Sequence, residues 1–355
     1  MTEDIIAHIS ETGPKLVCLI EKNSEIEEIK DFLEKHPESV HYRLPETLDS
    51  PLHIAVRQGS LAVVKSLIEY GHIWNEVNKD KISAGELAEK DSDIYEYLLN
   101  EGCRCEMILN LLERKNTEFE NEYGESDNLT VQYLSNDITY SDGKLLDSEK
   151  NAVMMAWEAP LMKRHAEILV PRENEVHVLN IGFGLGIIDS YIQQRNPKSH
   201  TIIEAHPKVL EYMKNNGWYE KENVRILEGT WQDCLPKIMN ENYEFCNLFD
   251  SIFFDTFSEN YQALYKFHSF LPQILKEGGT YTFFNGLGGT NQFFYSVYSR
   301  IVDMDLAQLG FKVEFENISM NDLGDDIWQD TRREYWSLPV YMLPICILES
   351  MWEEE

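Results

Sequence analysis

A chain of 355 residues with a formal net charge of −31 is long enough for two folded domains. Apolar residues make up 43% of it and aromatic residues 12%, which excludes an intrinsically disordered chain. The acidic excess is spread over both halves, so it disfavours nucleic-acid or membrane binding and favours a basic protein partner. Plain solubility is an equally good explanation for the charge alone.

The six cysteines show no disulfide framework, because Cys103 and Cys105 are separated by a single residue and no zinc-type pair follows. We therefore expect a reduced, intracellular setting without a metal site. Glu3 and Asp4 precede the first apolar run, so the basic start of a signal peptide is lacking. These features predict a cytoplasmic protein, and entry into the nucleus stays open.

Residues 1–120 predict a small all-α domain. Helical patterns cover about residues 5–20 and 26–33, and residues 50–55 read Ser-Pro-Leu-His-Ile-Ala, close to the ankyrin signature T-P-L-H-x-A. Ala84 follows Pro51 by one ankyrin period of 33 residues and opens a second, degenerate unit. This pattern resembles a short ankyrin stack, in which His53 is expected to be structural and two repeats bury little core alone.

The ends of the ankyrin helices are predicted from glycines. Gly71 is expected to end a helix over residues 61–68, and Gly102 one over residues 94–99. A terminal capping helix is expected over residues 108–112, followed by a linker or loop over residues 116–130.

Residues 121–355 predict an α/β domain with a doubly wound, mostly parallel sheet. A helical pattern covers residues 151–169 and holds Met154, Trp157 and Glu158. The last pattern, over residues 335–348, is expected to return as an antiparallel strand. The other strands are expected over residues 176–181, 200–204, 224–227, 247–255, 280–284 and 312–316, with helices over residues 266–275 and 296–309.

One stretch in this domain carries the chemistry. Residues 176–190 read as a strand, a turn with Gly182, Gly184 and Gly186, and a helix, which leaves backbone N–H groups open to a polar ligand. A dinucleotide fingerprint needs its third glycine at position 187, which is Ile187, so the spacing favours S-adenosylmethionine over a nicotinamide cofactor. Asn180 departs from that pattern, which usually has an acid there, and an ordinary tight turn is the structural alternative.

Acidic residues follow at the ends of the next strands. Glu204 lies eighteen residues after Gly186, where such folds place an acceptor for ribose hydroxyls. Asp255 ends a buried strand, beside where a reactive methyl would lie, unless it only caps a helix. Trp231 could flank an adenine. Glu158, unless it is a solvated helix residue, is the natural second acid for a cationic substrate.

Four stretches resemble the guanidinoacetate methyltransferase family: residues 153–160, 181–184, 229–233 and 254–257. With the ankyrin pattern added, the chain resembles the fungal type IV protein arginine N5-methyltransferases. The resemblance implies a seven-stranded methyltransferase sheet and transfer of a methyl group from S-adenosylmethionine to the internal δ-nitrogen of a protein arginine. In place of the Leu-Thr-Ser that contacts guanidinoacetate, this chain has Gly286-Leu287-Gly288, which argues for a larger substrate.

The resemblance also implies the site residues. Glu158 and Asp255 are the implied catalytic residues and would grip the guanidinium. The implied cofactor-binding residues are Tyr133, Met154, Gly182, Phe183, Gly184, Leu185, Gly186, Ile187, Glu204, Ala205, His206, Gly229, Thr230 and Asp255.

Two other functions stay open at this point. One is methylation of a small guanidino compound, and the other is a non-catalytic ankyrin adaptor with a vestigial methyltransferase fold. The expected partners are a basic protein substrate, such as a ribosomal protein, and a protein that contacts the ankyrin repeats; neither nucleic acid nor a membrane is expected.

Overall fold

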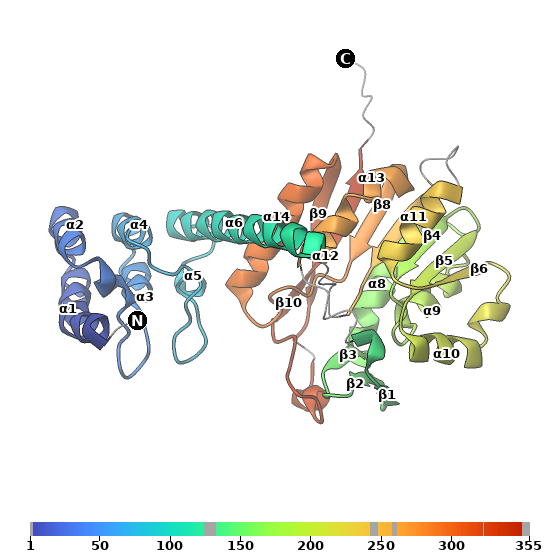
Figure 1. The fold of residues 1–355 in the computed structure, drawn as a ribbon, viewed down its shortest axis with the longest axis horizontal. Coiled ribbons are helices and arrows are strands. Elements are labelled where there is room, and N and C mark those ends of the chain that lie inside the picture. Colours follow the sequence, from blue (N-terminus) through green and yellow to red (C-terminus); the bar gives the residue numbers. More distant parts are fainter. Residues whose placement is uncertain (1–2, 124–132, 242–247, 258–260, 322, 350–355) are drawn as a thin grey trace, which may run out of the picture. The chain divides into compact units, whose positions relative to one another are not determined.

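The computed structural model describes residues 3–123, 133–241, 248–257, 261–321 and 323–349 (Figure 1). The chain divides into two compact units. Unit 1 contains residues Met1–Leu112 and Asn291–Ile301, and unit 2 contains Glu113–Thr290 and Val302–Glu355. Among the described residues, no helix is long and apolar enough to cross a membrane.

Unit 1 is built from helices whose apolar faces pack together. Leu16, Ile29, Leu52 and Val64 come from four different helices and are fully buried. The helices predicted over residues 5–20, 26–33 and 61–68 are confirmed. The helices are α1 (Glu3–Glu21), α2 (Ile26–Lys35), η1 (Pro37–His41), α3 (Pro51–Arg57), α4 (Leu61–Glu69), α5 (Ala84–Leu87), α6 (Asp93–Tyr123) and the first part of α14 (Gln292–Gln308).

His53 stabilises the turns of the ankyrin region, as its motif predicts. The side chain is fully buried, and its Nε2 lies 3.0 Å from the carbonyl oxygen of Ile82. Its Nδ1 lies 3.2 Å from the backbone N of Ser50, the residue that caps α3. One tautomer satisfies both contacts, with Nε2–H donating and Nδ1 accepting. His53 therefore joins two turns through their backbone groups.

The end of the predicted ankyrin stack differs from expectation. Gly102 does not end a helix but lies inside α6, which continues to Tyr123. A Cβ at Gly102 would lie 2.8 Å from Val297 Cγ2 and 3.0 Å from the Trp74 ring, so this glycine allows close packing. The prediction of a separate capping helix over residues 108–112 is therefore wrong, because these residues lie inside α6. The predicted loop is also wrong from residue 116 to Tyr123, where α6 ends. The predicted domain boundary between residues 120 and 121 also lies inside α6, so no change in secondary structure marks this boundary.

A segment from the C-terminal half completes unit 1. Phe293 in α14 is buried, and its ring centroid lies 6.1 Å from that of Trp74 and 5.3 Å from that of Tyr95. Asn291 Nδ2 donates to Glu86 Oε2 at 2.8 Å. The ankyrin region thus buries part of its apolar surface against residues about 200 positions later in the chain.

Unit 2 contains a seven-stranded sheet in the order β6-β5-β4-β7-β8-β10-β9 (Figure 1). Only β10 runs antiparallel to its neighbours, β8 and β9, which confirms the predicted antiparallel last strand. Parallel neighbours place the carboxyl ends of β4, β5 and β7 at one edge. The strands are β4 (His177–Ile181), β5 (Ser199–Glu204), β6 (Val224–Glu228), β7 (Phe249–Phe254), β8 (Leu275–Phe283), β9 (Phe311–Ser319) and β10 (Val340–Leu348).

Helices alternate with these strands, as the sequence predicts for a doubly wound sheet. The helix predicted over residues 266–275 is interrupted, and α12 and α13 take its place. The helices of unit 2 are η2 (Ala156–Glu158), α8 (Ala159–Leu169), α9 (Ile187–Gln194), α10 (Pro207–Asn215), η3 (Trp218–Glu220), α11 (Trp231–Glu241), α12 (Tyr261–His268), α13 (Leu271–Ile274), the last part of α14, and η4 (Asp325–Trp328).

A small antiparallel sheet precedes β4. It consists of β1 (Ile138–Ser141), β2 (Lys144–Asp147) and β3 (Ala152–Met155). The helix predicted over residues 151–169 is therefore wrong at its start, where Leu145 pairs with Met154, and correct only from Ala159. The apolar spacing of this stretch fits a helix, but backbone pairing with β2 decides the conformation.

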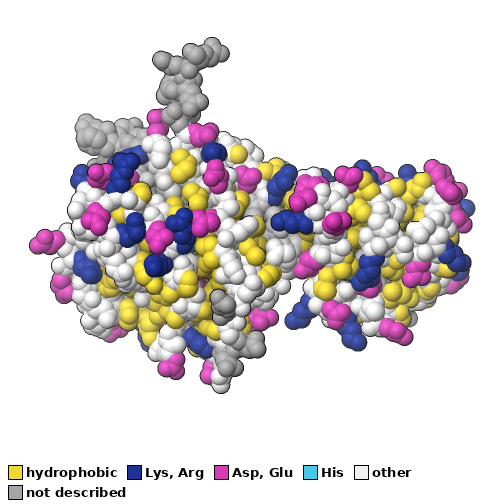
Figure 2. Space-filling model, turned by 180° about the vertical axis from the view of Figure 1, so that it is seen from behind, with side chains coloured by type: hydrophobic (Ala, Val, Ile, Leu, Met, Phe, Trp, Pro, Cys, Tyr) yellow, Lys and Arg dark blue, Asp and Glu magenta, His cyan; other side chains and the backbone are white. Residues whose placement is uncertain are grey.

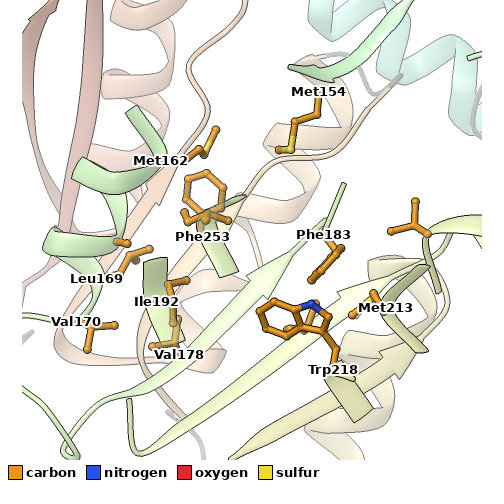
Figure 3. Close-up of a cluster of buried hydrophobic side chains, with 14 of the residues drawn as sticks. Met154, Met162, Leu169, Val170, Val178, Phe183, Ile192, Met213, Trp218 and Phe253 are labelled. Carbon is orange, nitrogen blue, oxygen red and sulfur yellow. The ribbon is translucent and has the colours of Figure 1, made fainter. Parts of the chain in front are cut away.

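One hydrophobic core extends from this small sheet to the seven-stranded sheet (Figure 3). Met154 of β3 and Phe183 of the glycine turn both belong to it. The Phe183 ring meets the Trp218 ring edge-on with a centroid distance of 5.0 Å. This packing anchors the glycine turn to the interior, which keeps its backbone in a fixed position.

Candidate functional site

The glycine turn between β4 and α9 needs its glycines for two reasons. Gly182, Gly184 and Gly186 have φ values of 91°, 56° and 68°, in the left-handed region that other residues rarely adopt. A Cβ at Gly182 would also collide with the carbonyl oxygen of Asp255, and one at Gly184 would lie 2.9 Å from Met154 Sδ. The turn therefore brings the ends of β4 and β7 into backbone contact.

Glu204 fixes this turn from the end of β5. Its two oxygens accept backbone N–H groups from Phe183 at 2.8 Å, Ala205 at 2.8 Å and His206 at 2.7 Å. Burial raises the pKa of the Glu204 carboxyl, and these backbone donors oppose the rise. Glu204 therefore connects the glycine turn to the strand beside it and presents an acid at the sheet edge.

Asn180, the departure from the usual pattern, is paired with an acid from another element. Its Nδ2 donates to Asp189 Oδ1 at 2.7 Å and to the carbonyl oxygen of Gly182 at 2.9 Å. Asp189 lies in the first turn of α9 and is fully buried, with His200 Nε2 3.3 Å from its Oδ1. A buried carboxylate thus still supports the glycine turn, but it comes from α9 instead of β4.

A pocket of about 650 Å³ opens over the carboxyl ends of β4, β5, β6 and β7. It brings together most of the predicted cofactor residues from six separate segments. Its lining residues are Tyr133, Leu134, Val153, Met154, Ile181, Gly182, Gly184, Ile203, Glu204, Ala205, Gly229, Thr230, Trp231, Gln232, Asp255, Thr256 and Phe257.

The remaining predicted cofactor residues support the pocket from behind. Phe183 packs in the core, and Leu185 N lies 3.3 Å from Met154 Sδ. Gly186 caps α9, and Ile187 is the first residue of that helix. His206 is buried and its ring lies 5.0 Å from that of Tyr133.

Some lining residues have no role predicted from the sequence. Leu134 belongs to no quoted motif. Val153, Gln232 and Phe257 lie in the stretches that carry the family resemblance, but no role was assigned to them, and the Phe257 ring centroid lies 4.9 Å from that of Tyr133. Their position depends on how the small sheet and the loop after β7 fold over the pocket, which no local pattern specifies.

The two predicted catalytic carboxylates lie close enough to influence each other. Glu158 ends η2 and is buried, and Asp255 follows β7 and is half-buried. Burial and the nearby Asp255 charge raise the pKa of Glu158, and burial raises the pKa of Asp255. Of the two, Asp255 lines the pocket. Two uncompensated acids in one buried site favour a cationic ligand.

Tyr335 is a site residue that the sequence analysis missed. Its hydroxyl donates a hydrogen bond to Glu158 Oε1, and the backbone N–H of Met155 donates to the same oxygen at 3.0 Å. Tyr335 lies 177 positions after Glu158, so no spacing rule links them. The adjacent aromatic residues Tyr335 and Trp336 were the only local signal.

A second pocket, of about 580 Å³, meets the first at Asp255 and Thr256. It is lined by Phe254, Asp255, Thr256, Leu264, Phe284, Gly286 and Leu287. These lining residues include no lysine or arginine. Asp255 therefore lies where two pockets join, one over the glycine turn and one toward Gly286.

Comparisons with known proteins agree with this geometry. The guanidinoacetate N-methyltransferase family model matches residues 123–349, and the ankyrin repeat model matches residues 47–79. Protein arginine N-methyltransferase 2 of Aspergillus oryzae is 33% identical, covering 97% of this chain and 95% of its own length. The protein of the same name from Saccharomyces cerevisiae is 34% identical, and the match covers 83% of this chain and 82% of that protein.

The chain belongs to the protein arginine N-methyltransferase 2 family. It is a methyltransferase, and its cofactor is S-adenosylmethionine. Among solved structures, the O-methyltransferase TomG of Streptomyces achromogenes is 13% identical with a TM-score of 0.39, covering 56% of this chain and 82% of its own. Spermidine synthase of Thermotoga maritima is 14% identical with a TM-score of 0.39, covering 61% and 72%.

The residues present fit this cofactor. Gly182 and Gly184 line the pocket, and Glu204 supplies an acidic acceptor at the next strand end.

Proposed function

We propose that this chain methylates the δ-nitrogen of arginine in a basic protein. The observation that carries the proposal is the pair of carboxylates Glu158 and Asp255. Burial and the Asp255 charge raise the pKa of Glu158, so the two acids lie near each other, and Asp255 lines the cofactor pocket. A planar guanidinium offers five N–H donors and a fixed positive charge, so it can bind two carboxylates at once. The names of the relatives, protein arginine N-methyltransferase 2, support arginine as the substrate group.

The proposed chemistry depends mainly on positioning. When bound, S-adenosylmethionine supplies an activated methyl group. Glu158 and Asp255 hold the terminal nitrogens of the guanidinium and thereby orient the δ-nitrogen toward the cofactor pocket. A guanidinium is a poor nucleophile because its pKa exceeds about 12, so a proton must leave. Asp255, which lies at the junction of the two pockets, is the proposed acceptor of that proton.

The second pocket supports a protein substrate over guanidinoacetate. A free carboxylate in that pocket would need a positive charge or several donors, and the lining residues include neither lysine nor arginine. Gly286 and Leu287 provide an apolar wall with a small residue, which suits the neutral backbone of a peptide. This feature favours an arginine whose carboxylate is already in a peptide bond.

The surface charge supports a basic protein substrate. The formal net charge is −31, and Figure 2 shows Asp and Glu side chains spread over the face in view. Long-range attraction would raise the encounter rate with a cationic protein, such as a ribosomal protein. The ankyrin repeat at residues 47–79 is the proposed contact for recruiting the substrate or another protein.

The test compares substrates and identifies the methylated nitrogen. The full chain is incubated with isotope-labelled S-adenosylmethionine and either an arginine-rich basic protein or guanidinoacetate. We expect label in the protein only, and fragment-ion mass spectrometry should place it on the δ-nitrogen. Label on a terminal nitrogen would contradict the proposed position, and preference for guanidinoacetate would support the small-molecule alternative.

Cofactor binding tests the remaining alternative. Isothermal titration should show saturable binding of S-adenosylmethionine to the full chain. Absence of binding would favour a non-catalytic ankyrin adaptor.

A further inference from the structure

Tyr335 contacts the proposed substrate site from a segment that no motif includes. It lies between η4 and β10, is half-buried, and donates its hydroxyl to Glu158 Oε1. Its ring centroid lies 5.6 Å from that of Trp157 and 4.8 Å from that of Trp328. These two rings hold the phenol in place, so the hydroxyl meets Glu158 without a large loss of side-chain entropy.

The hydrogen bond determines which oxygen of Glu158 can meet a substrate. Oε1 already accepts from the Met155 backbone N–H at 3.0 Å and from Tyr335. Oε2 accepts no hydrogen bond from the described residues. The described groups that act on the Glu158 charge are Asp255, which raises its pKa, and Tyr335 and the Met155 N–H, which lower it.

We propose that Tyr335 is a positioning residue for arginine binding and methylation: its hydroxyl holds Oε1 of Glu158, so that Oε2 faces the guanidinium. This role rests on the proposed function for the identity of the substrate. The same hydrogen bond lowers the pKa of Glu158, because a donor to the carboxylate stabilises the charged form, and so it opposes the rise caused by burial and by Asp255.

The test uses Tyr335→Phe, which removes the hydroxyl and keeps the ring. Without the donor, the pKa of Glu158 rises, so the acid limb of kcat/KM should move to higher pH, by about one pH unit for a hydrogen bond to a charged group. The affinity for S-adenosylmethionine should stay unchanged because Tyr335 does not line that pocket. An unshifted acid limb would overturn the proposal.

A second readout separates this role from the proposed function. An arginine peptide is titrated into the full chain saturated with S-adenosylhomocysteine, over a range of pH. Acidification should weaken peptide binding in both proteins. In Tyr335→Phe the loss of affinity should begin at a higher pH than in the wild type. If the wild type binds the peptide in this manner but transfers no methyl group, the proposed function fails and the role of Tyr335 stands.

Tyr219→Phe is the matched control. Tyr219 OH also donates to a glutamate, Glu228 Oε1, at 2.8 Å, but it is exposed at the surface. This variant should keep the wild-type pH profile. An equal shift in both variants would show a general effect of losing a tyrosine hydroxyl and would overturn the specific role of Tyr335.

A different observation, in unit 1, carries a second inference. His8 of α1, His36 after α2 and Glu38 of η1 place one nitrogen or oxygen atom each within 4.8 Å of one another. His8 Nε2 lies 3.1 Å from His36 Nδ1 and 2.7 Å from Glu38 Oε1. All three side chains are half-buried and come from separate elements.

A single N–H hydrogen on His8 Nε2 cannot satisfy the contacts with both His36 and Glu38. His8 Nε2 carries a single N–H at most, yet it faces both the His36 nitrogen and the Glu38 oxygen. A divalent cation would accept a lone pair from each of the three atoms. Two imidazoles and one carboxylate form a ligand set that zinc uses, with a fourth position open to water.

We infer that His8, His36 and Glu38 bind a divalent transition metal of the zinc type. Co²⁺ titrated into the metal-free full chain should give the visible absorption of a tetrahedral site at one equivalent, and excess Zn²⁺ should abolish it. Zn²⁺ should also raise the Tm. His8→Ala and Glu38→Gln should lose these responses.

His41→Ala is the matched control, because His41 is an exposed histidine in the same short helix as Glu38. It should bind Co²⁺ as the wild type does. Absence of saturable Co²⁺ binding in the wild type, or equal binding by His8→Ala and His41→Ala, would overturn the inference.

Discussion

Two neighbouring acids, the buried Glu158 and the half-buried Asp255, dominate the chemistry at the level of single residues. Burial raises the pKa of both Glu158 and Asp255, and neither is paired with a cation among the described residues. The substrate guanidinium would supply the missing positive charge. The same feature that makes the site costly without substrate therefore makes it selective for a bidentate cation.

Asp255→Asn tests the catalytic role of this pair. We expect kcat/KM for an arginine substrate to fall by about 10²–10⁴-fold, because the amide neither accepts the proton nor balances the guanidinium charge. The Kd for S-adenosylmethionine should change little. Asp250→Asn, in the strand β7 that leads to Asp255, changes a carboxylate that accepts a hydrogen bond from Lys276, and this variant should retain activity. Similar activity of both variants would exclude Asp255 as the proton acceptor.

The pH dependence of stability gives a second test. A carboxyl with a raised folded-state pKa contributes stability below its unfolded pKa, near 4, and loses it as pH rises toward the folded value. Asp255→Asn is neutral throughout, so its Tm relative to wild type should increase between pH 4 and pH 8. Each kcal/mol of gain corresponds to roughly 2–4 °C for a unit of this size. A Tm difference that stays constant over this range would contradict the assigned shift.

At the scale of elements, the sequence predicts those features that neighbouring residues determine, and it does not predict those that depend on distant contacts. The turn at Gly182, Gly184 and Gly186 is readable because positive φ and close backbone contact both require glycine. The sequence predicts a helix where β3 forms, because its apolar spacing fits either state and only the pairing with β2 decides between them. Gly102 was read as a helix end because close packing against Val297 leaves no local mark. Tyr335 was missed for the same reason, since its partner is remote in sequence.

The variants Gly182→Ala and Gly278→Ala separate the effect of backbone strain at a positive φ from the effect of a steric collision of the new Cβ atom. Both glycines have positive φ, but a Cβ at Gly278 would meet no atom within 4 Å, whereas one at Gly182 would collide with the Asp255 carbonyl. Gly278→Ala should cost about 1–3 kcal/mol of stability from strain and leave cofactor binding intact. Gly182→Ala should lose saturable S-adenosylmethionine binding in isothermal titration. Equal affinities in the two variants would show that the close contact is dispensable.

At the scale of the whole chain, unit 1 is discontinuous. Residues 291–301 belong to it, although unit 2 supplies the chain before and after them. The expected division at residues 120 and 121 leaves this segment out, because no sequence pattern predicts that a helix of the later half completes an ankyrin stack. The apolar surface that a short stack cannot bury alone is instead buried against α14.

Phe293→Ala tests this contribution. Phe293 is buried against Trp74 and Tyr95, so its loss should lower the free energy of unfolding of unit 1 by about 3–5 kcal/mol. Met304→Ala, at an exposed position of the same helix, should change it by less than about 0.5 kcal/mol. Guanidinium chloride unfolding followed by tryptophan fluorescence measures both. Equal effects would show that α14 adds no specific packing to unit 1.

The discontinuous unit has a consequence for biosynthesis. While the ribosome translates residues 113–290, the N-terminal helices lack Phe293 and its neighbours, for a time on the order of 10–40 s at usual elongation rates. Nascent chains stalled before residue 291 should therefore be cleaved by protease within residues 1–112, and chains released after residue 301 should resist. During this delay chaperones can bind the incomplete ankyrin stack. Slow or paused translation of the catalytic half would therefore reduce the folding yield of residues 1–112, which are already synthesised.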